Sequence, residues 1–141
     1  MSDLKQRILQ ITQQLQLVSL ATVTEEGKPW VRYVMALSDD GLTMRCATFA
    51  NARKVRQIAE NPEVHLTCGV TDPAVMKPYL QIQATARLAT DEAERHAFWN
   101  DTLKEIFDGP DDPKYAVLVM PAYRVEYWSP DSFEPEVWET P

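Results

Sequence analysis

The feature that most constrains the fold is a series of short segments in which apolar and polar residues alternate. The clearest is segment 79–88, in which the apolar residues Leu80, Ile82, Ala84, Ala86 and Leu88 alternate with Gln81, Gln83, Thr85 and Arg87. Because successive side chains of a strand point to opposite faces, this pattern predicts a strand with one buried face. Related patterns predict further strands at 17–23, 30–37, 42–49, 64–70, 115–120 and 123–128, the last two separated at Pro121.

Tight turns separate the first predicted strands. Segment 25–28 (EEGK) predicts a turn in which Gly27 supplies a positive φ, and segment 38–41 (SDDG) predicts a second turn of the hairpin type. Strands joined by tight turns pair antiparallel, and this many strands in one small domain favour a barrel over an open sheet. We therefore expect a mainly β protein with some α (α+β): a small antiparallel β-barrel with peripheral helices.

Three helices are predicted beside these strands. The first is capped by Ser2 and carries apolar residues at helical spacing, namely Leu4, Ile8, Ile11 and Leu15. The third spans 92–107; Asp91 and Glu94 form a capping-box-like start, and the Gly- and Pro-rich segment 108–113 ends it. The acidic, Pro-rich residues from 129 onward are expected to be irregular.

Composition restricts the class of protein. The 141 residues, of which 45% are hydrophobic and 25% charged, suit a single domain covering 1–141. A net charge of −7 argues against general binding to nucleic acid or to anionic membranes, because phosphate groups require a basic surface. No apolar run is long enough for a membrane span, and the first ten residues do not form a signal peptide. We expect a cytoplasmic protein.

The cysteine and histidine residues do not indicate a metal site. Cys46 and Cys68 are not part of a C-x-x-C pair, and isolated strand cysteines usually behave as small buried apolar residues. His65 and His96 lie in no ligand motif and are expected to be structural or solvent-facing. Trp99, Trp128 and Trp138 are expected to pack in the core or at a subunit interface.

Segment 42–61 reverses the acidic character of the chain, because it holds four basic residues and one acidic residue. Its second half predicts a helix with Asn51 as N-cap and its end at Asn61, which precedes a proline. Arg53 and Lys54 then fall in the first turn, where backbone N–H groups are already positive. Cations at this position are well explained if an anion, above all a phosphate, binds there.

Arg32 is a second candidate for anion binding, since it interrupts the apolar strand 30–37. One interpretation is an arginine that points outward from a one-sided sheet. The other is a guanidinium that binds a phosphate with its two-pronged geometry. Arg53 and Lys54 are likewise either solvated surface charges or part of the same site. If the strands are neighbours, Arg32, Thr48 and the pair Arg53-Lys54 converge.

The order of these motifs resembles a known family. The segments SLATVTEEGKPWVRYV (19–34), CATFANARKVRQIAENPEVHL (46–66), YLQIQATARLATD (79–91) and VEYW (125–128) carry the resemblance, together with FDGPDDP at 107–113. They are similar to the flavin-binding split-barrel family related to pyridoxamine phosphate oxidase, and most closely to its short members of the general-stress-protein type. The resemblance covers nearly the whole chain and implies a split β-barrel.

The same resemblance implies a cofactor and its site. FMN would be bound by residues of one strand (Arg32, Tyr33, Val34 and Met35), by Thr48 at the end of the next strand, and by Arg53 and Lys54 at the following helix. Arg32, Arg53 and Lys54 would contact the phosphate, and Thr48 the ring system or ribityl chain. In this family the cofactor lies at the two-fold interface of a homodimer, so an aromatic residue of the partner subunit would border the flavin.

Three positions depart from the family pattern. Ala52 stands where a serine is common, which removes one hydroxyl from the phosphate site. A hydrogen bond to a charged group contributes about 1.5–3 kcal/mol, so FMN affinity is expected to fall about 10- to 100-fold unless Asn51 or Arg53 compensates. Ala84 replaces a glycine in the fifth strand. The ending EVWETP lacks the arginine-leucine-x-proline motif of the true oxidases, so vitamin B6 oxidation is not expected.

The leading hypothesis is a homodimeric, FMN-dependent oxidoreductase that acts on an unknown small molecule, with a nicotinamide nucleotide as the natural electron donor. No side chain stands out as a catalytic acid, base or nucleophile, and flavin would supply the chemistry. Two alternatives remain open: a non-catalytic flavin-binding module of the stress response, and the same fold binding haem or the deazaflavin F420. Neither histidine lies in a haem-ligand context, and an F420 polyglutamate tail would require a more basic surface.

Overall fold

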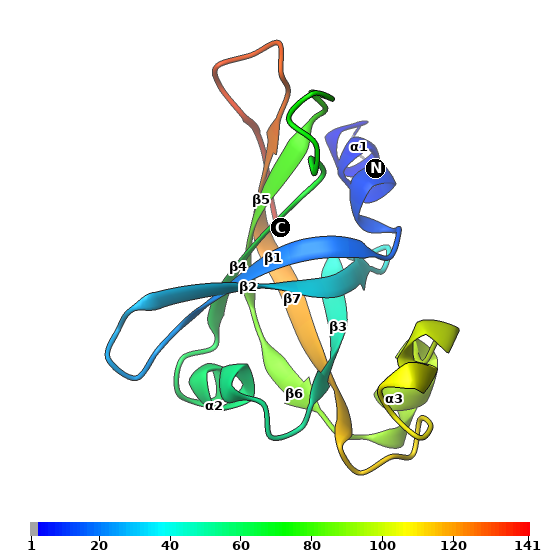
Figure 1. Cartoon of the computed structure of the whole chain (residues 1–141). Coiled ribbons are helices and arrows are strands. Elements are labelled where there is room, and N and C mark those ends of the chain that lie inside the picture. The colour runs from blue at the N-terminus through cyan, green and yellow to red at the C-terminus, as the bar shows by residue number, and fades with distance from the viewer. Residues whose placement is uncertain (1–2) are drawn as a thin grey trace.

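The computed structural model describes residues 3–141 (Figure 1). In chain order the elements are α1 (Asp3–Thr12), β1 (Gln16–Val23), β2 (Pro29–Ser38), β3 (Thr43–Phe49), α2 (Arg53–Glu60), β4 (Glu63–Cys68), β5 (Tyr79–Thr85), β6 (Arg87–Ala89), α3 (Glu92–Phe98), the 3-10 helix η1 (Asp101–Glu105), β7 (Tyr115–Trp128) and β8 (Glu136–Glu139). The proposed cap at Ser2 lies outside the described residues. No helix of the described chain is long and apolar enough to cross a membrane.

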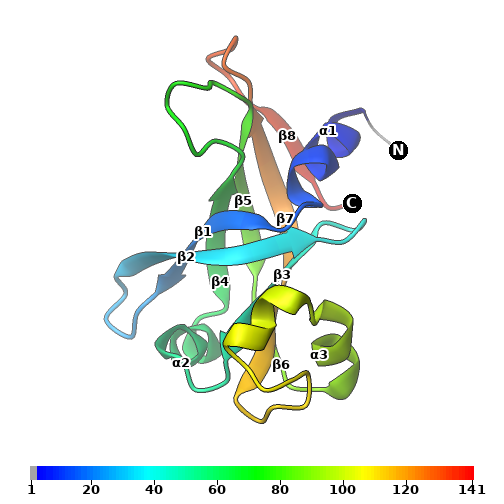
Figure 2. The same cartoon turned by 45° about the vertical axis from the view of Figure 1, so that its right-hand side comes forward.

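Six strands close into a barrel. They pair in the order β3-β2-β1-β4-β5-β7, and β3 also pairs with β7, which completes the ring. All these pairings are antiparallel, while β6 and β8 extend the sheet through further antiparallel pairs with β7. The β1–β2 hairpin projects from one side of the barrel, with α2 beneath it (Figures 1 and 2). The predicted split β-barrel with peripheral helices is confirmed.

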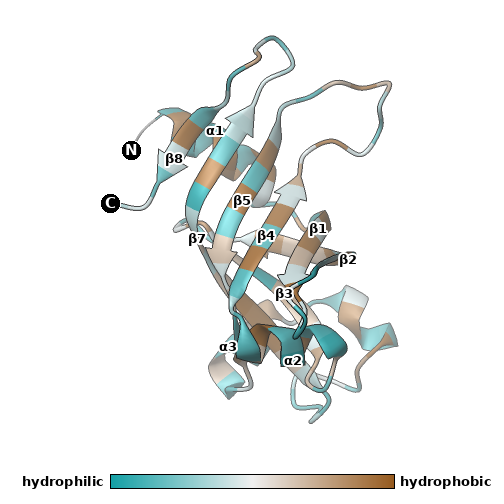
Figure 3. Cartoon of the chain, turned by 90° about the vertical axis from the view of Figure 1, so that its left-hand side faces the viewer, coloured by the Kyte–Doolittle hydropathy of each residue, from teal (hydrophilic) through white to brown (hydrophobic). Residues whose placement is uncertain are grey.

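The alternation of the sequence determines which strand face is buried. Along β4, β5 and β7, apolar and polar bands follow one another (Figure 3). In β3 and the residue before it, Leu42, Met44, Cys46 and Thr48 are all less than 5% exposed, as their period-two spacing predicts. Burying each large apolar side chain stabilises the fold by about 1.5–3 kcal/mol, so a shift of one residue in register would be strongly unfavourable.

A second, smaller apolar cluster lies outside the barrel. Phe98, Leu103 and Phe107, which belong to α3, η1 and the segment after it, pack against Tyr115 and Val117 of β7. Figure 2 shows α3 beside the lower part of the barrel and the segment that follows it in front. This cluster determines where segment 98–107 lies, and that segment forms part of the site described below.

The predicted helix 92–107 is wrong in its second half. α3 ends at Phe98, and the chain continues as the short helix η1 after a break at Trp99 and Asn100. The side chain of Asn100 accepts a hydrogen bond from the backbone N–H of Thr102 at 3.1 Å, which caps η1. Asparagine favours this capping role over a helix interior, so it starts a new helix and ends the old one.

The predicted N-cap Asn51 is also wrong. α2 begins at Arg53, so Ala52 occupies the cap position, and no side chain caps the helix there. The end of α2 agrees with the prediction, because Asn61 is the C-cap. The helix therefore starts with backbone N–H groups that no side chain of the cap satisfies.

Four strand boundaries differ from the prediction. The strand predicted at 64–70 ends at Cys68, the last residue of β4. Segment 79–88 is split because the N–H of Ala86 donates to the carbonyl of Pro62 at 2.8 Å and leaves the ladder. β7 continues through Pro121, which lies at the last pairing of β7 with β3, where the missing N–H disrupts little. The tail, expected to be irregular, contains β8, because residues 136–139 pair with β7.

Candidate cofactor site

Arg32 lies on the inward face of β2, the face it shares with buried Ala36. Its guanidinium donates to the carbonyls of Leu20 at 3.0 Å and Trp30 at 3.2 Å, and to Oε1 of Gln57 on α2 at 3.2 Å. The alternative of an outward-pointing arginine is therefore wrong. The contact with Gln57 holds the charge of Arg32 beside α2.

Arg53 and Lys54 occupy the first turn of α2, as predicted. The guanidinium of Arg53 lies over the ring of Trp30, 4.5 Å from its centroid, a cation–π contact that joins α2 to β2. Lys54 is half-buried, and burial is the main reason that its pKa is lowered, with a further lowering by the charge of Arg32. Burial also lowers the pKa of Arg32, and the charge of Arg53 adds to that effect.

Three cations thus lie near one another, and no carboxylate of the described chain neutralises them. None of the ion pairs formed within residues 3–141 includes Arg32, Arg53 or Lys54. Their mutual repulsion and partial burial cost free energy in the unliganded chain. A bound anion would offset that cost, and the first turn of α2 offers it backbone N–H groups as well.

A cavity of about 360 Å³ adjoins this cluster. Five of the seven predicted site residues line it: Tyr33, Val34, Met35, Thr48 and Lys54. Arg32 and Arg53 do not line it, but the charge of Arg53 acts on Arg32, and the charge of Arg32 acts on Lys54. The volume falls within the usual range for small-molecule sites.

The opposite wall of the cavity was not predicted from the sequence. It comes from α3, η1 and the residues after them, namely Phe98, Asn100, Thr102, Leu103, Ile106 and Phe107. The ring of Phe107 lies 4.9 Å from that of Phe49 and 5.0 Å from that of Tyr115, between centroids. These aromatic contacts between residues far apart in the sequence hold the wall formed by α3, η1 and the residues after them. No local sequence pattern predicts such contacts.

Two further features concern the end of β3. Thr48 is buried, and its hydroxyl donates to the carbonyl of Phe49 at 3.1 Å. Ala52, which follows shortly after, offers no hydroxyl either to cap α2 or to meet an anion. Ala52, which stands where a serine is common, therefore lies at the start of the helix that carries Arg53 and Lys54.

The outer face of the β1–β2 hairpin is apolar and exposed. Leu17 pairs with Met35, Ser19 with Tyr33, and Ala21 with Val31. Val31 is 68% exposed and Tyr33 73% exposed, unusually high fractions for strand residues of this type. Tyr33 also borders a second hollow of about 510 Å³ between β1 and segment 70–73. Tyr33 thus lines both the 360 Å³ cavity and the 510 Å³ hollow.

The tryptophans and histidines predicted to be structural lie in varied surroundings. Trp99 packs edge-on against Tyr115, with 5.4 Å between ring centroids, and Trp138 packs against the main core. Trp128 stacks near Tyr79, with 6.3 Å between centroids. His65 lies on the outer barrel face beside Glu126, and burial lowers its pKa. None of these residues lines the 360 Å³ cavity.

Comparison with known proteins agrees with the fold. The family model described as pyridoxamine 5'-phosphate oxidase matches residues 4–129, which is most of the chain. The chain belongs to this family. Within the pyridoxamine 5'-phosphate oxidase family, it is 33% identical to general stress protein 26 of Bacillus subtilis (strain 168) over 116 residues, which cover 82% of this chain and 81% of that protein.

Solved structures of family members are similar throughout the chain. The crystal structure of general stress protein 26 from Bacillus anthracis str. Sterne has a TM-score of 0.85 and 27% identity, covering 99% of this chain and 100% of that one. A protein related to general stress protein 26 from Clostridium acetobutylicum has a TM-score of 0.73 and 24% identity, covering 87% and 84%. The expected resemblance to the general-stress-protein type is confirmed.

Proposed function

We propose that the chain is an FMN-binding flavoprotein that works as a homodimer and transfers electrons to or from an unidentified small molecule. The observation that carries this proposal is the cluster of Arg32, Arg53 and Lys54, three cations with no carboxylate partner in the described chain, at the edge of an apolar cavity. A flavin mononucleotide has a matching chemistry: a phosphate for the cations and a planar, largely apolar ring for the cavity.

The residues have separate roles in this proposal. Arg32, held toward α2 by Leu20, Trp30 and Gln57, and Lys54 would bind phosphate oxygens through charge-assisted hydrogen bonds. Val34, Met35, Thr48 and the wall of η1 would exclude water from the ring. Bound FMN supplies hydride and electron transfer, and the protein supplies its orientation and its electrostatic surroundings.

Four exposed apolar residues on the outer face of β1 and β2, here called the apolar strip, support the homodimer: Leu17, Val31, Tyr33 and Met35. Tyr33 and Met35 line the cavity, yet they are 73% and 48% exposed, so a monomer leaves the cavity open on this side. A second copy that covers the strip would bury apolar surface and close the site with its own side chains. This placement supports the proposal that the cofactor lies between two subunits.

Other ligands are known for this fold and define the alternatives. Solved structures similar to this chain include an FMN-binding protein from Nostoc punctiforme, an F420 reductase and a heme binding protein from Mycobacterium smegmatis. The described residues that line the 360 Å³ cavity include no histidine or cysteine, which leaves Tyr33 and Met35 as its only side chains of a haem-ligating type. The net charge of −7 disfavours the polyanionic tail of F420.

A double substitution tests the phosphate assignment. Arg32→Ala with Lys54→Ala removes two charge-assisted contacts, each worth about 1.5–3 kcal/mol, so FMN affinity should fall more than about 100-fold. Quenching of FMN fluorescence on binding measures it. The control is Lys28→Ala with Arg56→Ala, which removes the same charge from exposed positions. Equal affinity in the two double variants would show that the phosphate lies elsewhere.

Redox activity requires its own experiment. Anaerobic mixing of the FMN-loaded protein with NADH or NADPH, followed by absorbance, should show bleaching of the oxidised flavin. If FMN binds but neither nucleotide reduces it at a useful rate, the non-catalytic flavin-binding module is favoured. A protein that does not quench FMN fluorescence at all would contradict both the oxidoreductase and the non-catalytic flavin-binding module.

A further inference from the structure

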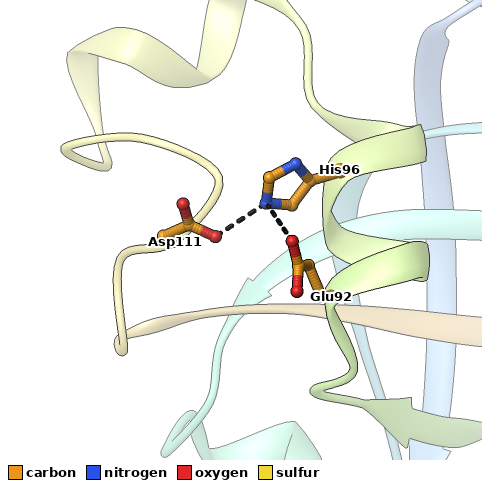
Figure 4. Close-up of side chains that lie close together, drawn as sticks. All are labelled: Glu92, His96 and Asp111. Carbon is orange, nitrogen blue, oxygen red and sulfur yellow. Dashed lines mark hydrogen bonds and ion pairs between the residues drawn. The ribbon is translucent and has the colours of Figure 1, made fainter.

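Three exposed side chains converge on one another, and none of them lines the 360 Å³ cavity (Figure 4). His96 of α3 lies between Asp111, on the loop after η1, and Glu92, one helical turn earlier. Its Nε2 is 2.7 Å from Oδ1 of Asp111 and 3.9 Å from Oε1 of Glu92. The three ligand atoms all lie within 4.8 Å of one another. The imidazole nitrogen and the two carboxylates therefore face one point.

The distances suit a small divalent cation. Zinc binds imidazole nitrogen and carboxylate oxygen at about 2.0–2.2 Å, so two ligands of a tetrahedral site are separated by about 3.4 Å. The two separations from Nε2 lie on either side of this value, and all three side chains are exposed and free to adjust. A nitrogen ligand favours zinc over magnesium or calcium, which prefer oxygen ligands. Three protein ligands leave the fourth position to water.

The charge of the cluster also favours a cation. Glu92 and Asp111 carry two negative charges around one imidazole, and no arginine or lysine within residues 3–141 forms an ion pair with either carboxylate. The nearby guanidinium of Arg95 instead approaches the backbone carbonyl of Asp112, at 3.5 Å. Without a metal, an exposed histidine–carboxylate pair contributes little in water. A metal would convert these weak contacts into coordinate bonds.

The cluster joins the two ends of a functional segment. Glu92 and His96 precede residues 97–110, and Asp111 follows them. Every wall residue that η1 and its flanks give to the cavity lies between these ends: Phe98, Asn100, Thr102, Leu103, Ile106 and Phe107. Closing a loop at its ends reduces the conformational freedom of the chain between them. A metal at this point would therefore limit the motion of the cavity wall.

We propose that Glu92, His96 and Asp111 form a zinc-binding site that ties α3 to the loop after η1 and thereby holds segment 97–110 in place. Sequence patterns did not indicate the site, because its histidine and carboxylates match no common ligand motif and the third ligand comes from another element. The spacing of Glu92 and His96, four residues apart on a helix, is the one local sign.

Calorimetric titration of the full chain with zinc chloride tests the site. One zinc ion should bind per chain, and affinity should fall at least about tenfold in His96→Gln and in Asp111→Asn. His65→Gln and Asp101→Asn are the matched controls and should bind zinc like the unmodified chain. Excess magnesium should not compete. Absence of binding at millimolar zinc, or unchanged affinity in the variant carrying both His96→Gln and Asp111→Asn, would overturn the proposal.

Hydrogen exchange tests the effect on the wall, without reference to FMN. Zinc should slow amide exchange within residues 97–110 of the unmodified chain and leave it unchanged in His96→Gln. Slower exchange in the unmodified chain but not in His96→Gln would support a zinc link between α3 and the loop after η1. Zinc binding at the expected stoichiometry with no slowing in this segment would overturn the structural role assigned to the metal.

Discussion

At the scale of single residues, the candidate cofactor site is built from charges that destabilise the protein on their own. Arg32 and Lys54 are each partly buried, and this burial is the main cause of the lowered pKa of both side chains. A sequence selected for stability alone would place carboxylates beside them, as it does around Arg45, which contacts both Asp39 and Glu94. The lack of such partners within residues 3–141 is best explained by a ligand that brings its own negative charge.

The lowered pKa of Lys54 leads to a prediction about the unliganded chain. Between this lowered pKa and the ordinary value of 10.5, unfolded chains bind more protons at Lys54 than folded chains do. The free energy of unfolding should therefore rise with pH across this window. Urea unfolding at several pH values should show this rise for the unmodified chain and a smaller rise for Lys54→Met. Lys28→Met, at an exposed position, should keep the slope of the unmodified chain; identical slopes in all three would contradict the prediction.

Ala52 provides a second prediction at this scale. The substitution Ala52→Ser would place a hydroxyl at the start of α2, where it can accept a hydrogen bond from the backbone N–H of Lys54 or Val55. This cap should raise the free energy of unfolding by about 0.5–2 kcal/mol. The hydroxyl also lies at the proposed phosphate site, so FMN affinity should rise. Chemical denaturation and fluorescence titration measure the two effects.

The pair Ala52→Thr and Ala52→Val separates the hydroxyl from the added bulk, because the two side chains have nearly the same shape. Only the threonine variant should gain stability and FMN affinity. If the valine variant gains as much, then packing at this position, and not hydrogen bonding, is the cause.

At the scale of elements, a close backbone approach joins β4 to β5. Gly69 directly follows β4 and has a φ of +117°, and a Cβ there would lie 2.7 Å from the carbonyl oxygen of Pro78 and 3.0 Å from Cα of Tyr79. Gly69→Ala should therefore lower the free energy of unfolding by about 1–3 kcal/mol. Gly109→Ala is the control, since a Cβ at Gly109 meets nothing within 4 Å and its φ is not in the left-handed region. Urea denaturation of both variants checks the difference; equal stability would contradict it.

Elements whose bounds depend on neighbouring residues could be predicted from the sequence. Elements whose bounds depend on contacts between residues far apart in the sequence could not. The buried face of β3 follows from alternation alone, and the end of α2 follows from Asn61 and the proline after it. The break between α3 and η1 depends on whether Asn100 caps a new helix, and Phe107 favours that outcome by packing against Phe49, far away in the sequence. Residues of β2, β3 and α2 that line the cavity were therefore among those named from the sequence, and the residues of its η1 wall were not.

At the scale of the whole molecule, the cavity is bordered on one side by Tyr33 and Met35, exposed residues of the apolar strip on β1 and β2. Leu17 and Val31 belong to this strip without lining the 360 Å³ cavity, so they can be changed without altering the side chains that line it. Leu17→Glu with Val31→Glu should place like charges face to face across a two-fold axis, where each copy meets the same surface of the other. The strip would then repel its partner.

Sedimentation over a range of protein concentrations should show a dimer for the unmodified chain and a monomer for this double variant. Phe133→Glu is the control, because Phe133 is fully exposed on the β7–β8 connection and lies outside the strip. FMN affinity should fall together with dimerisation, since each site would lose the surface that its partner contributes. A monomeric variant that binds FMN as tightly as the dimer would show that one chain suffices for the cofactor, and the interface would then serve another purpose.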